Sequence, residues 1–340
     1  MNIKEQVPLA PYTTFHIGGP ARFFVHAPSI EEIKEALSFA KERNIPVLIL
    51  GGGSNVLIDD AGFDGLVIKI ELSGVELQKN AAEVLLVAGA GENWDGVVAR
   101  AVGEGLWGIE NLSGIPGTMG AAPVQNIGAY GTELKDTLTW VEVLDTETKE
   151  IKKMSNAECA FGYRTSIFKK NPGRFVVLRV ALTLHAQGAA NLAYRDLAEA
   201  FVGIPAPGLG DIRAAVLAIR ARKFPDLAHE GTAGSFFLNP TISIQKAAEL
   251  AAQFPALPQY QGELGVKISL AWLLDNALQL KGAAVAGARL FEKQPLVIVA
   301  QNPPAGGCSS RDVVALAHKV KKEVKEKIGI EIELEVKIIS

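Results

Sequence analysis

The sequence contains only two cysteines in 340 residues, Cys159 and Cys308. They are far apart and form no metal-type pair, so neither a disulfide framework nor a cysteine metal site is indicated. Long apolar runs are also missing, since residues 47–50 and 296–300 have the length of strands rather than of a membrane span. The first residues lack an apolar core followed by a cleavage site. We therefore expect reduced thiols, no metal, no membrane insertion and a cytoplasmic location.

No charge of one sign dominates. The sequence has 34 Lys and Arg against 37 Asp and Glu, a formal net charge of -3. Nucleic-acid binding depends on many cationic contacts that release counterions, so we expect no nucleic-acid partner. A local cluster of Lys and Arg could still hold an anionic small molecule. With 48% hydrophobic residues, a chain of this length is expected to form two or three globular domains.

The hydrophobic pattern predicts helices and strands without a regular alternation, which indicates an α+β fold. Ser29 is predicted to be the N-cap of a helix over 30–43, with Glu32 completing a capping box. The alternating charged and apolar residues at 331–339 predict a half-buried strand. Further strands are expected at 22–26, 47–50, 66–70, 84–88, 140–144, 175–184 and 297–300, and further helices at 93–104, 212–222, 243–253, 269–277 and 310–328.

A glycine-rich turn, Gly51-Gly52-Gly53-Ser54-Asn55, follows the apolar run 47–50. Glycines let backbone N–H groups approach a phosphate, and Ser and Asn add side-chain donors. The spacing does not match GxGxxG, because Val56 stands where the last glycine would be, and no Walker lysine follows. Phosphate binding and a tight turn between strands both remain open for this motif alone.

The most informative segment is 105–131, in which closely spaced glycines alternate with small and apolar residues. It shows neither a helical period nor sustained alternation, which predicts irregular backbone. A surface loop of this length is usually more polar. We therefore favour a segment that lies against a planar cofactor over a plain loop.

Two further motifs contain candidate chemical groups. Arg164 lies between aromatic residues in FGYRTSIFK, where it is either a partly desolvated cation at a site or a surface residue stacked on aromatics. Ser235 in GTAGSFFLNP lacks the Gly-x-Ser-x-Gly pattern and any neighbouring base, so its hydroxyl suits proton donation better than nucleophilic attack. Glu333 and Glu335 would share one face of the last strand, where solvation is the simpler explanation. The cations at the end of helix 212–222 have a similarly simple explanation in the helix dipole.

Taken together, these segments resemble the UDP-N-acetylenolpyruvoylglucosamine reductase family, also called MurB. The similarity spans nearly the whole chain in family order, and Tyr194 in LAYRDL resembles the longer family type with an extra loop over the substrate. The matching strings are TFHIGGPA, LILGGGSN, GAGENW, IPGTMGAAPVQNIGAYG, FGYRTSIFK, GTAGSFFLNP and LEVKII. Thr13 and Lys337 depart from the family pattern, which usually has Asn and Arg there.

The resemblance implies three domains, of which two form a vanillyl-alcohol-oxidase/PCMH-type FAD-binding fold and a smaller α+β domain binds substrate. We expect these domains at residues 1–70, joined by the strand 330–340, at 71–210 and at 211–329. It also implies noncovalent FAD, NADPH as co-substrate, and UDP-N-acetylglucosamine enolpyruvate as the small-molecule substrate. We expect a monomer.

The resemblance assigns roles to individual residues. NADPH would reduce the flavin, flavin N5 would pass hydride to the enolpyruvyl β-carbon, and Ser235 would protonate the α-carbon. Arg164 would stabilise the enolate, and Glu335 would polarise the carboxylate or relay the proton. The substrate would contact Tyr163, Tyr194, Lys223, Asn239 and Gln294. FAD would contact Gly51, Gly52, Gly53, Ser54, Asn55, Ile115, Pro116, Gly117, Gly120, Ala121, Asn126, Gly128 and Tyr130.

Two other functions compete with this interpretation. One is an FAD oxidase of the same fold that uses O₂ and tethers its flavin through His or Cys, for which the glycine-rich segments offer only His16. The other is a nucleotide-binding or sensor module without turnover. Such a module would have no need of a proton donor, so Arg164, Ser235 and Glu335 argue against it.

Overall fold

The computed structural model describes residues 1–80, 83–262, 265–301 and 307–340, which form two compact units. Each unit is assembled from stretches that are distant in sequence. Unit 1 comprises Met1–Val7, Ala21–Gly52 and Asp64–Arg220, and unit 2 comprises Pro8–Pro20, Gly53–Phe63 and Ala221–Ser340. Both units contain helices and strands, which confirms the predicted α+β class. The division into three domains stays a prediction.

Unit 1 contains two principal sheets. The first has the strand order β1-β2-β5-β3, formed by Lys4–Pro8, Pro20–Ala27, Phe63–Ile70 and Val47–Leu50, with β3 parallel to β5. The second is antiparallel with the order β11-β10-β12-β7-β6, formed by Ile151–Ser155, Leu138–Asp145, Phe175–His185, Glu83–Gly89 and Val75–Asn80. A ribbon pairs β8 (Gly128–Ala129) with β9 (Thr132–Glu133).

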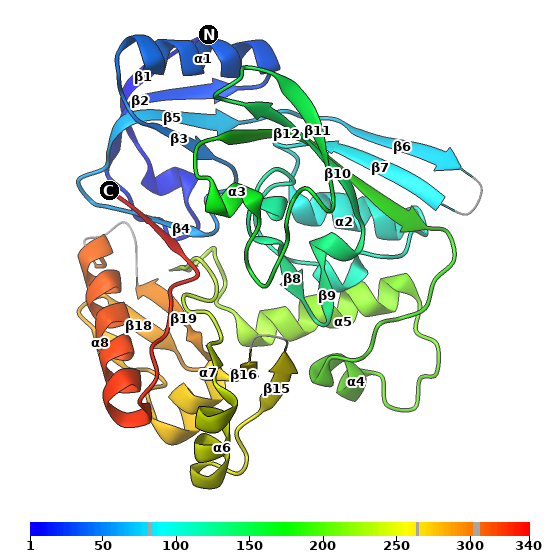
Figure 1. Cartoon of the computed structure of the whole chain (residues 1–340), viewed down its shortest axis with the longest axis vertical. Helices are drawn as coiled ribbons and strands as arrows, with labels where there is room; N and C mark the ends of the chain where they lie inside the picture. Colours follow the sequence, from blue (N-terminus) through cyan, green and yellow to red (C-terminus); the bar gives the residue numbers. More distant parts are fainter. Residues whose placement is uncertain (81–82, 263–264, 302–306) are drawn as a thin grey trace. The chain divides into compact units, whose positions relative to one another are not determined.

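The helices of unit 1 supply part of its core. Helix α1 (Ile30–Glu42) lies across the first sheet (Figure 1) and buries Ile33, Ala36, Leu37 and Ala40, a spacing that places them on one helix face. Its other helices are α2 (Trp94–Gly103), α3 (Ile167–Lys170), α4 (Arg195–Ala200) and most of α5 (Leu209–Lys223), with 3-10 turns at Glu110–Leu112, Ala122–Gln125 and Leu134–Asp136.

The predicted start of α1 is confirmed. The Ser29 Oγ accepts a hydrogen bond from the Glu32 N–H at 3.2 Å. The Ser29 hydroxyl in turn donates to the Glu32 carboxylate at 3.3 Å. The predicted N-cap is therefore confirmed, but the capping box is not formed, because the Glu32 carboxylate is bonded to the Ser29 hydroxyl rather than to the Ser29 N–H.

Unit 2 packs helices against small sheets. Helix α8 (Ser310–Ile328) contacts β17 (Ala284–Val285) and β18 (Ala288–Phe291), which share a sheet with β13 (Glu230–Gly231) and β19 (Gln294–Gln301) (Figure 1). Apolar residues along one face of α8, from Val313 to Ile328, enter the core of the unit. The remaining elements are β14 (Thr241–Ile242), β15 (Gln259–Gly262), β16 (Gly265–Ile268), β4 (Val56–Ile58), β20 (Lys337–Ile339), α6 (Ile244–Gln253), α7 (Leu270–Trp272) and a 3-10 turn at Ala10–Tyr12.

The predicted C-terminal strand is wrong in its extent, because regular pairing covers only β20, which runs parallel to β4. The preceding residues are bonded to a different neighbour. The Leu238 N–H donates to the Glu333 carbonyl at 3.0 Å, and the Glu335 N–H donates to the Phe236 carbonyl at 2.9 Å. The chain changes partners here, so an alternating sequence does not produce one continuous strand.

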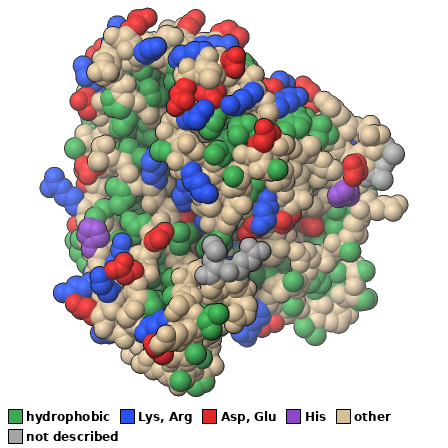
Figure 2. Space-filling view, in the orientation of Figure 1, with side chains coloured by type: hydrophobic (Ala, Val, Ile, Leu, Met, Phe, Trp, Pro, Cys, Tyr) green, Lys and Arg blue, Asp and Glu red, His purple; other side chains and the backbone are tan. Residues whose placement is uncertain are grey.

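Two other expectations bear on the site. The segment 105–131 is irregular as predicted, containing short 3-10 turns and the strand β8. The helix predicted at 269–277 forms as α7 followed by a π-helical turn at Leu273–Ala277. Within the described ranges, no helix combines the length and apolarity needed to cross a membrane. Figure 2 shows Lys and Arg side chains interspersed with Asp and Glu over the visible face.

Candidate active site

The glycine turn after β3 lies against the glycine-rich segment of unit 1. A Cβ on Gly52 would come within 2.7 Å of the Gly117 Cα. A Cβ on Gly51 would come within 2.7 Å of the Thr118 Oγ1 and 3.3 Å of the Ala121 Cβ. Two backbone segments therefore meet where no side chain larger than hydrogen fits. Sequence reasoning placed both segments at one cofactor, and the structure brings them together within this unit.

A buried hydroxyl at this meeting point has no partner. Thr118 is 8% exposed, and its Oγ1 makes no hydrogen bond. Leaving such a group unpaired costs about 1–3 kcal/mol, so its position beside the glycines fits a ligand that supplies the missing bond. Exposed backbone N–H groups in glycine turns also suit a pyrophosphate. These features fit a dinucleotide such as FAD. No motif in the sequence marks Thr118 as a site residue.

Three other predicted FAD contacts lack a feature that points to a ligand, namely Gly120, Ile115 and Pro116. A Cβ on Gly120 would approach the Ala90 Cβ to 2.6 Å, so this glycine serves close packing against the end of β7. Ile115 is partly buried against the core of unit 1, and Pro116 is exposed. Neither residue has a polar side chain, so any contact with a cofactor would be apolar or through the backbone.

Asn126 organises the next part of the segment. It is fully buried and holds a left-handed backbone conformation with φ 47°. Its Nδ2 donates to the Glu133 carboxylate at 2.9 Å and to the Gly162 carbonyl at 3.2 Å, and its Oδ1 accepts from the Lys135 N–H at 3.0 Å. This side chain therefore ties its own segment to residues 133–135 and to Gly162, which gives it a structural role whether or not it contacts FAD.

Arg164 is held by the glycine-rich segment. Its guanidinium donates to the Gly128 carbonyl at 2.6 Å and to the Asn126 carbonyl at 3.4 Å. A Cβ on Gly128 would lie 3.1 Å from the Arg164 Nη1, so glycine leaves room for this contact. The Arg164 backbone has φ 52° in a tight turn between Gly162 and Thr165, which bond to each other in both directions. The guanidinium is thus fixed by backbone carbonyls and half-buried, and its role at a site stays a prediction.

Tyr163 and Tyr194 present aromatic surface in unit 1. The Tyr163 ring is 39% exposed and lies 5.6 Å from the Arg164 guanidinium carbon. Tyr194, 41% exposed, packs edge-on against Tyr130 with ring centroids 5.2 Å apart. Exposed aromatic rings held by neighbours are suited to contact a ligand.

Tyr130 is fixed at both its backbone and its hydroxyl. Its carbonyl accepts from the Asn111 Nδ2 at 2.9 Å, and its backbone is left-handed with φ 49°. Its hydroxyl bonds to Arg220. Burial raises the pKa of Tyr130 above its usual value, and burial lowers the pKa of Arg220. Arg220 was explained from the sequence by the helix dipole alone, whereas the structure links it to the glycine-rich segment.

An ion pair that sequence reasoning missed connects α2 with α5. Asp95 and Arg213 form two parallel hydrogen bonds of 2.6 and 2.8 Å. The same carboxylate accepts from the Gly114 N–H at 2.6 Å. The bond from Arg213 lowers the pKa of Asp95 below its usual value. No local sequence signal links residues 118 positions apart, so only the fold reveals this pair.

Unit 2 brings Asn55, Ser235 and Glu335 into one neighbourhood. The Asn55 Nδ2 donates to the Glu335 carbonyl at 3.3 Å. The Glu335 N–H donates to the carbonyl of Phe236, the residue next to Ser235. Ser235 itself forms an isolated bridge with Val297 of β19. The main chains of the predicted proton donor and the predicted acid are therefore adjacent.

The loop that carries Ser235 is well fixed. Gly234 before it has φ 74°, a conformation that favours glycine. The Thr232 hydroxyl donates to the Ile298 carbonyl at 2.7 Å and accepts from the Gly234 N–H at 3.2 Å. The Phe236 N–H donates to the Leu296 carbonyl at 2.7 Å. Hydrogen bonds on both sides thus position the Ser235 backbone.

The remaining predicted residues differ in whether their polar groups are already bonded within the chain. The Gln294 Oε1 is buried and makes no hydrogen bond, which marks it as available to a ligand donor. The Asn239 Oδ1 accepts from the Leu270 N–H at 3.0 Å and so caps α7. Lys223 ends α5 and is half-buried. Gly53 has φ 63° and leaves no room for a side chain beside the Tyr12 carbonyl, and Ser54 follows it.

In the part of the chain that the structure describes, no group of three or more His, Cys, Asp or Glu side chains could hold a metal ion. Burial raises the pKa of both cysteine thiols to about 12. At neutral pH these thiols are protonated and poor nucleophiles.

Comparisons with known proteins cover the whole chain. Residues 21–155 match a family model of FAD-binding domains, and residues 226–339 match the C-terminal domain of UDP-N-acetylenolpyruvoylglucosamine reductase. The reductases of that name from Pseudomonas putida and Neisseria gonorrhoeae are each 40% identical to this chain, covering 98% of it and 97% and 96% of their own lengths. The solved structure of the Thermus caldophilus reductase (MurB) is 27% identical, with a TM-score of 0.71 and full coverage of both chains.

Proposed function

The chain belongs to the UDP-N-acetylenolpyruvoylglucosamine reductase family, and from this premise we propose that it reduces UDP-N-acetylglucosamine enolpyruvate to UDP-N-acetylmuramate with electrons from NADPH. Such an enzyme is an FAD-dependent oxidoreductase of peptidoglycan precursor synthesis. The single structural observation that carries the proposal is the bond between the Glu335 N–H and the Phe236 carbonyl, because it brings the main chain of the predicted acid beside that of the predicted proton donor.

FAD would be held by the glycine turn 51–55 and by the segment 115–130. The unpaired Thr118 hydroxyl and the space left by Gly51 and Gly52 support this assignment. When bound, FAD supplies the hydride chemistry, accepting a hydride from NADPH and donating it to the enolpyruvyl group. The protein positions and polarises the reacting groups.

Binding would be noncovalent. A covalent tether requires a reactive thiolate or a free imidazole, and both thiols are protonated at neutral pH. One imidazole nitrogen of His16 is bonded to the Leu227 carbonyl at 3.2 Å. These observations favour the reductase over an oxidase with tethered flavin.

Arg164, Ser235 and Glu335 would act on the substrate itself. Arg164 would stabilise the negative charge that develops on the carboxylate as the double bond is reduced, and its guanidinium is already fixed by Asn126 and Gly128. The Ser235 Oγ would donate the proton to the α-carbon. Glu335 would polarise the carboxylate or return a proton to Ser235.

Recognition of the UDP-sugar would fall to residues with polar or aromatic side chains. The unpaired Gln294 Oε1 would accept from a sugar or nucleotide donor. Tyr163 and Tyr194 would lie against the ligand, and Lys223 would neutralise a phosphate. Asn239 would contribute its Nδ2, since its Oδ1 already caps α7.

Ser235→Ala tests the assignment through the two half-reactions. Bleaching of the flavin by NADPH should continue at nearly the normal rate, whereas recolouring by the enolpyruvyl UDP-sugar should slow by about 10²–10⁴-fold, as expected for loss of a general acid. Ser235→Cys, which keeps a proton donor, should recover part of the loss, and Ser38→Ala on the exposed face of α1 is the matched control. Equal slowing of both half-reactions would contradict the proton-donor role.

A further inference from the structure

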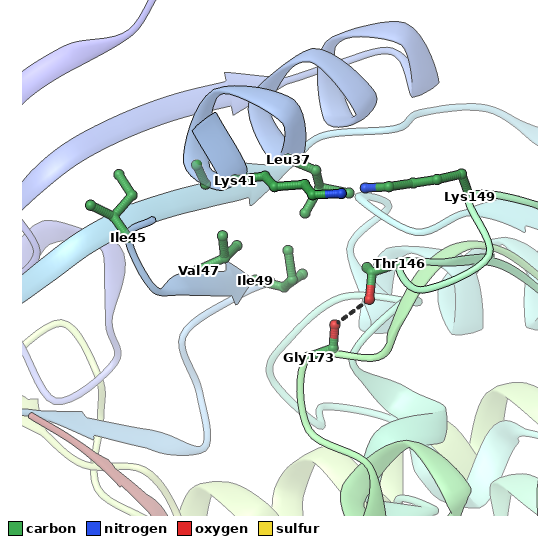
Figure 3. A pocket seen from close by; sticks show the side chains of 9 residues that line it. Leu37, Lys41, Ile45, Val47, Ile49, Thr146, Lys149 and Gly173 are labelled. Carbon is green, nitrogen blue, oxygen red and sulfur yellow. Dashed lines mark hydrogen bonds between the residues drawn. The ribbon is translucent and has the colours of Figure 1, made fainter. Parts of the chain in front are cut away.

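A pocket on unit 1 is lined by none of the predicted site residues (Figure 3). Its volume is about 240 Å³, and its floor is formed by apolar side chains of α1 and β3. The opposite wall comes from the turn after β10 and the loop before β12. The lining residues are Leu37, Ala40, Lys41, Ile45, Val47, Ile49, Thr146, Lys149 and Gly173.

Two lysines form the polar part of this pocket. In Figure 3 the side chains of Lys41 and Lys149 extend toward one another above the apolar floor. Neither has an ion-pair partner among the described residues, while nearby Arg174 is paired with Asp145 and Glu147. Two unpaired ammonium groups facing one another favour an anion between them.

The backbone of Lys149 gives an independent indication. Its φ is 66°, at a hairpin position that favours Gly or Asn. The turn is closed by a 2.8 Å bond from the Lys149 N–H to the Asp145 carbonyl, and the Asp145 Oδ1 accepts from the Glu147 N–H. A long side chain in this conformation is strained, and such strain occurs preferentially where a side chain serves a function. Here the strained residue directs its ammonium group to the pocket.

We propose that this pocket binds an amphipathic monoanion, an alkyl carboxylate whose head lies between Lys41 and Lys149 and whose chain covers Val47 and Ile49. The pocket volume of about 240 Å³ leaves room for a short alkyl chain over this floor. The floor strand β3 continues directly into the Gly51-Gly52 turn, so the ligand would contact the same strand that presents the proposed FAD-binding glycines. The site is independent of the proposed reaction.

Octanoate is a suitable probe for the FAD-loaded protein. Saturation-transfer NMR and calorimetry should show saturable binding with a Kd of about millimolar, as expected for about ten non-hydrogen atoms. Butanoate should bind at least about tenfold more weakly because it covers less of the floor. Octanol should also bind more weakly because it lacks the charge. Octyl phosphate distinguishes the head group, and tighter binding of the phosphate than of octanoate would overturn the choice of a carboxylate.

Two variants separate binding from folding. Lys41→Gln and Lys149→Asn should each weaken octanoate binding by about threefold, and together by about tenfold. Asn tolerates the left-handed conformation, so Lys149→Asn should not lower Tm. Lys34→Gln, on the exposed face of α1, should leave binding unchanged. Absence of saturable binding, equal affinity for octanol, or an unaltered Kd in the double variant would each overturn the proposal.

Discussion

The Asp95–Arg213 pair should stabilise unit 1 and the glycine-rich segment beside it. The change to make is Asp95→Asn, which removes the charge but keeps an oxygen that can accept from the Gly114 N–H. Breaking an exposed ion pair costs about 0.2–1 kcal/mol, and breaking a buried one about 3–5 kcal/mol. The Asp95 and Arg213 side chains are 31% and 17% exposed. We therefore expect a loss of about 2 kcal/mol in the free energy of unfolding.

A double-mutant cycle with Arg213→Gln isolates the interaction. Urea denaturation followed by intrinsic tryptophan fluorescence, to which the buried Trp94 contributes, should give a coupling energy of about 1–2 kcal/mol. The exposed pair Arg195–Glu199 serves as the control, and its cycle should give less than about 0.5 kcal/mol. Equal coupling in the two cycles, or none between Asp95 and Arg213, would refute the reasoning.

The pH dependence of the same pair has a defined sign. The bond from Arg213 lowers the pKa of the folded Asp95 carboxyl below the value of the unfolded chain. The stabilisation is therefore complete above the usual carboxyl pKa of about 4 and disappears as the pH falls through the lowered value. The stability difference between the native chain and Asp95→Asn should narrow only in acid. The whole range from pH 5 to 8 lies above that pKa of about 4. A stability difference that narrows as the pH rises through this range would contradict the assignment of the effect to Asp95.

Two further variants probe the proposed binding sites. Gly52→Ala should raise the Kd for FAD about tenfold or more, measured by flavin release, because its Cβ would meet the Gly117 backbone at 2.7 Å. Gly210→Ala, in α5 with open space around it, is the control and should leave FAD binding unchanged. Gln294→Met should keep or raise the unfolding free energy while raising KM for the UDP-sugar about tenfold, because the unpaired oxygen does not contribute to folding. A clear fall in stability would instead indicate a structural role.

Local patterns predicted much of the fold. The N-cap Ser29 specified the start of α1, and the alternation at 175–184 specified β12. The pattern failed at residues 331–339, where alternation continues although the chain exchanges one hydrogen-bonding partner for another. Periodicity records which side of the chain is buried, and it does not record which neighbour accepts the backbone bonds.

Only part of the site was predicted, because local patterns do not show which distant residues come into contact. Glycine spacing indicated both walls of the proposed FAD site, because glycine requirements are visible in the sequence. The residues that contact these glycine-rich segments were not predicted. Thr118 and Asp95 are ordinary residues until the fold buries one and pairs the other with Arg213. Contacts between distant residues leave no local signature when only one sequence is read.

The strained residues of unit 1 indicate how its part of the proposed site is prepared. Asn126, Tyr130 and Arg164 all have left-handed backbones, each costing about 1–3 kcal/mol. The bonds that offset this strain come from the chain itself, since Asn126 bonds the Glu133 carboxylate and two backbone groups, and Asn111 holds the Tyr130 carbonyl. A ligand does not need to provide this ordering energy. These bonds within the chain offset part of the cost of ordering the segment, so FAD binding has less of that cost to meet.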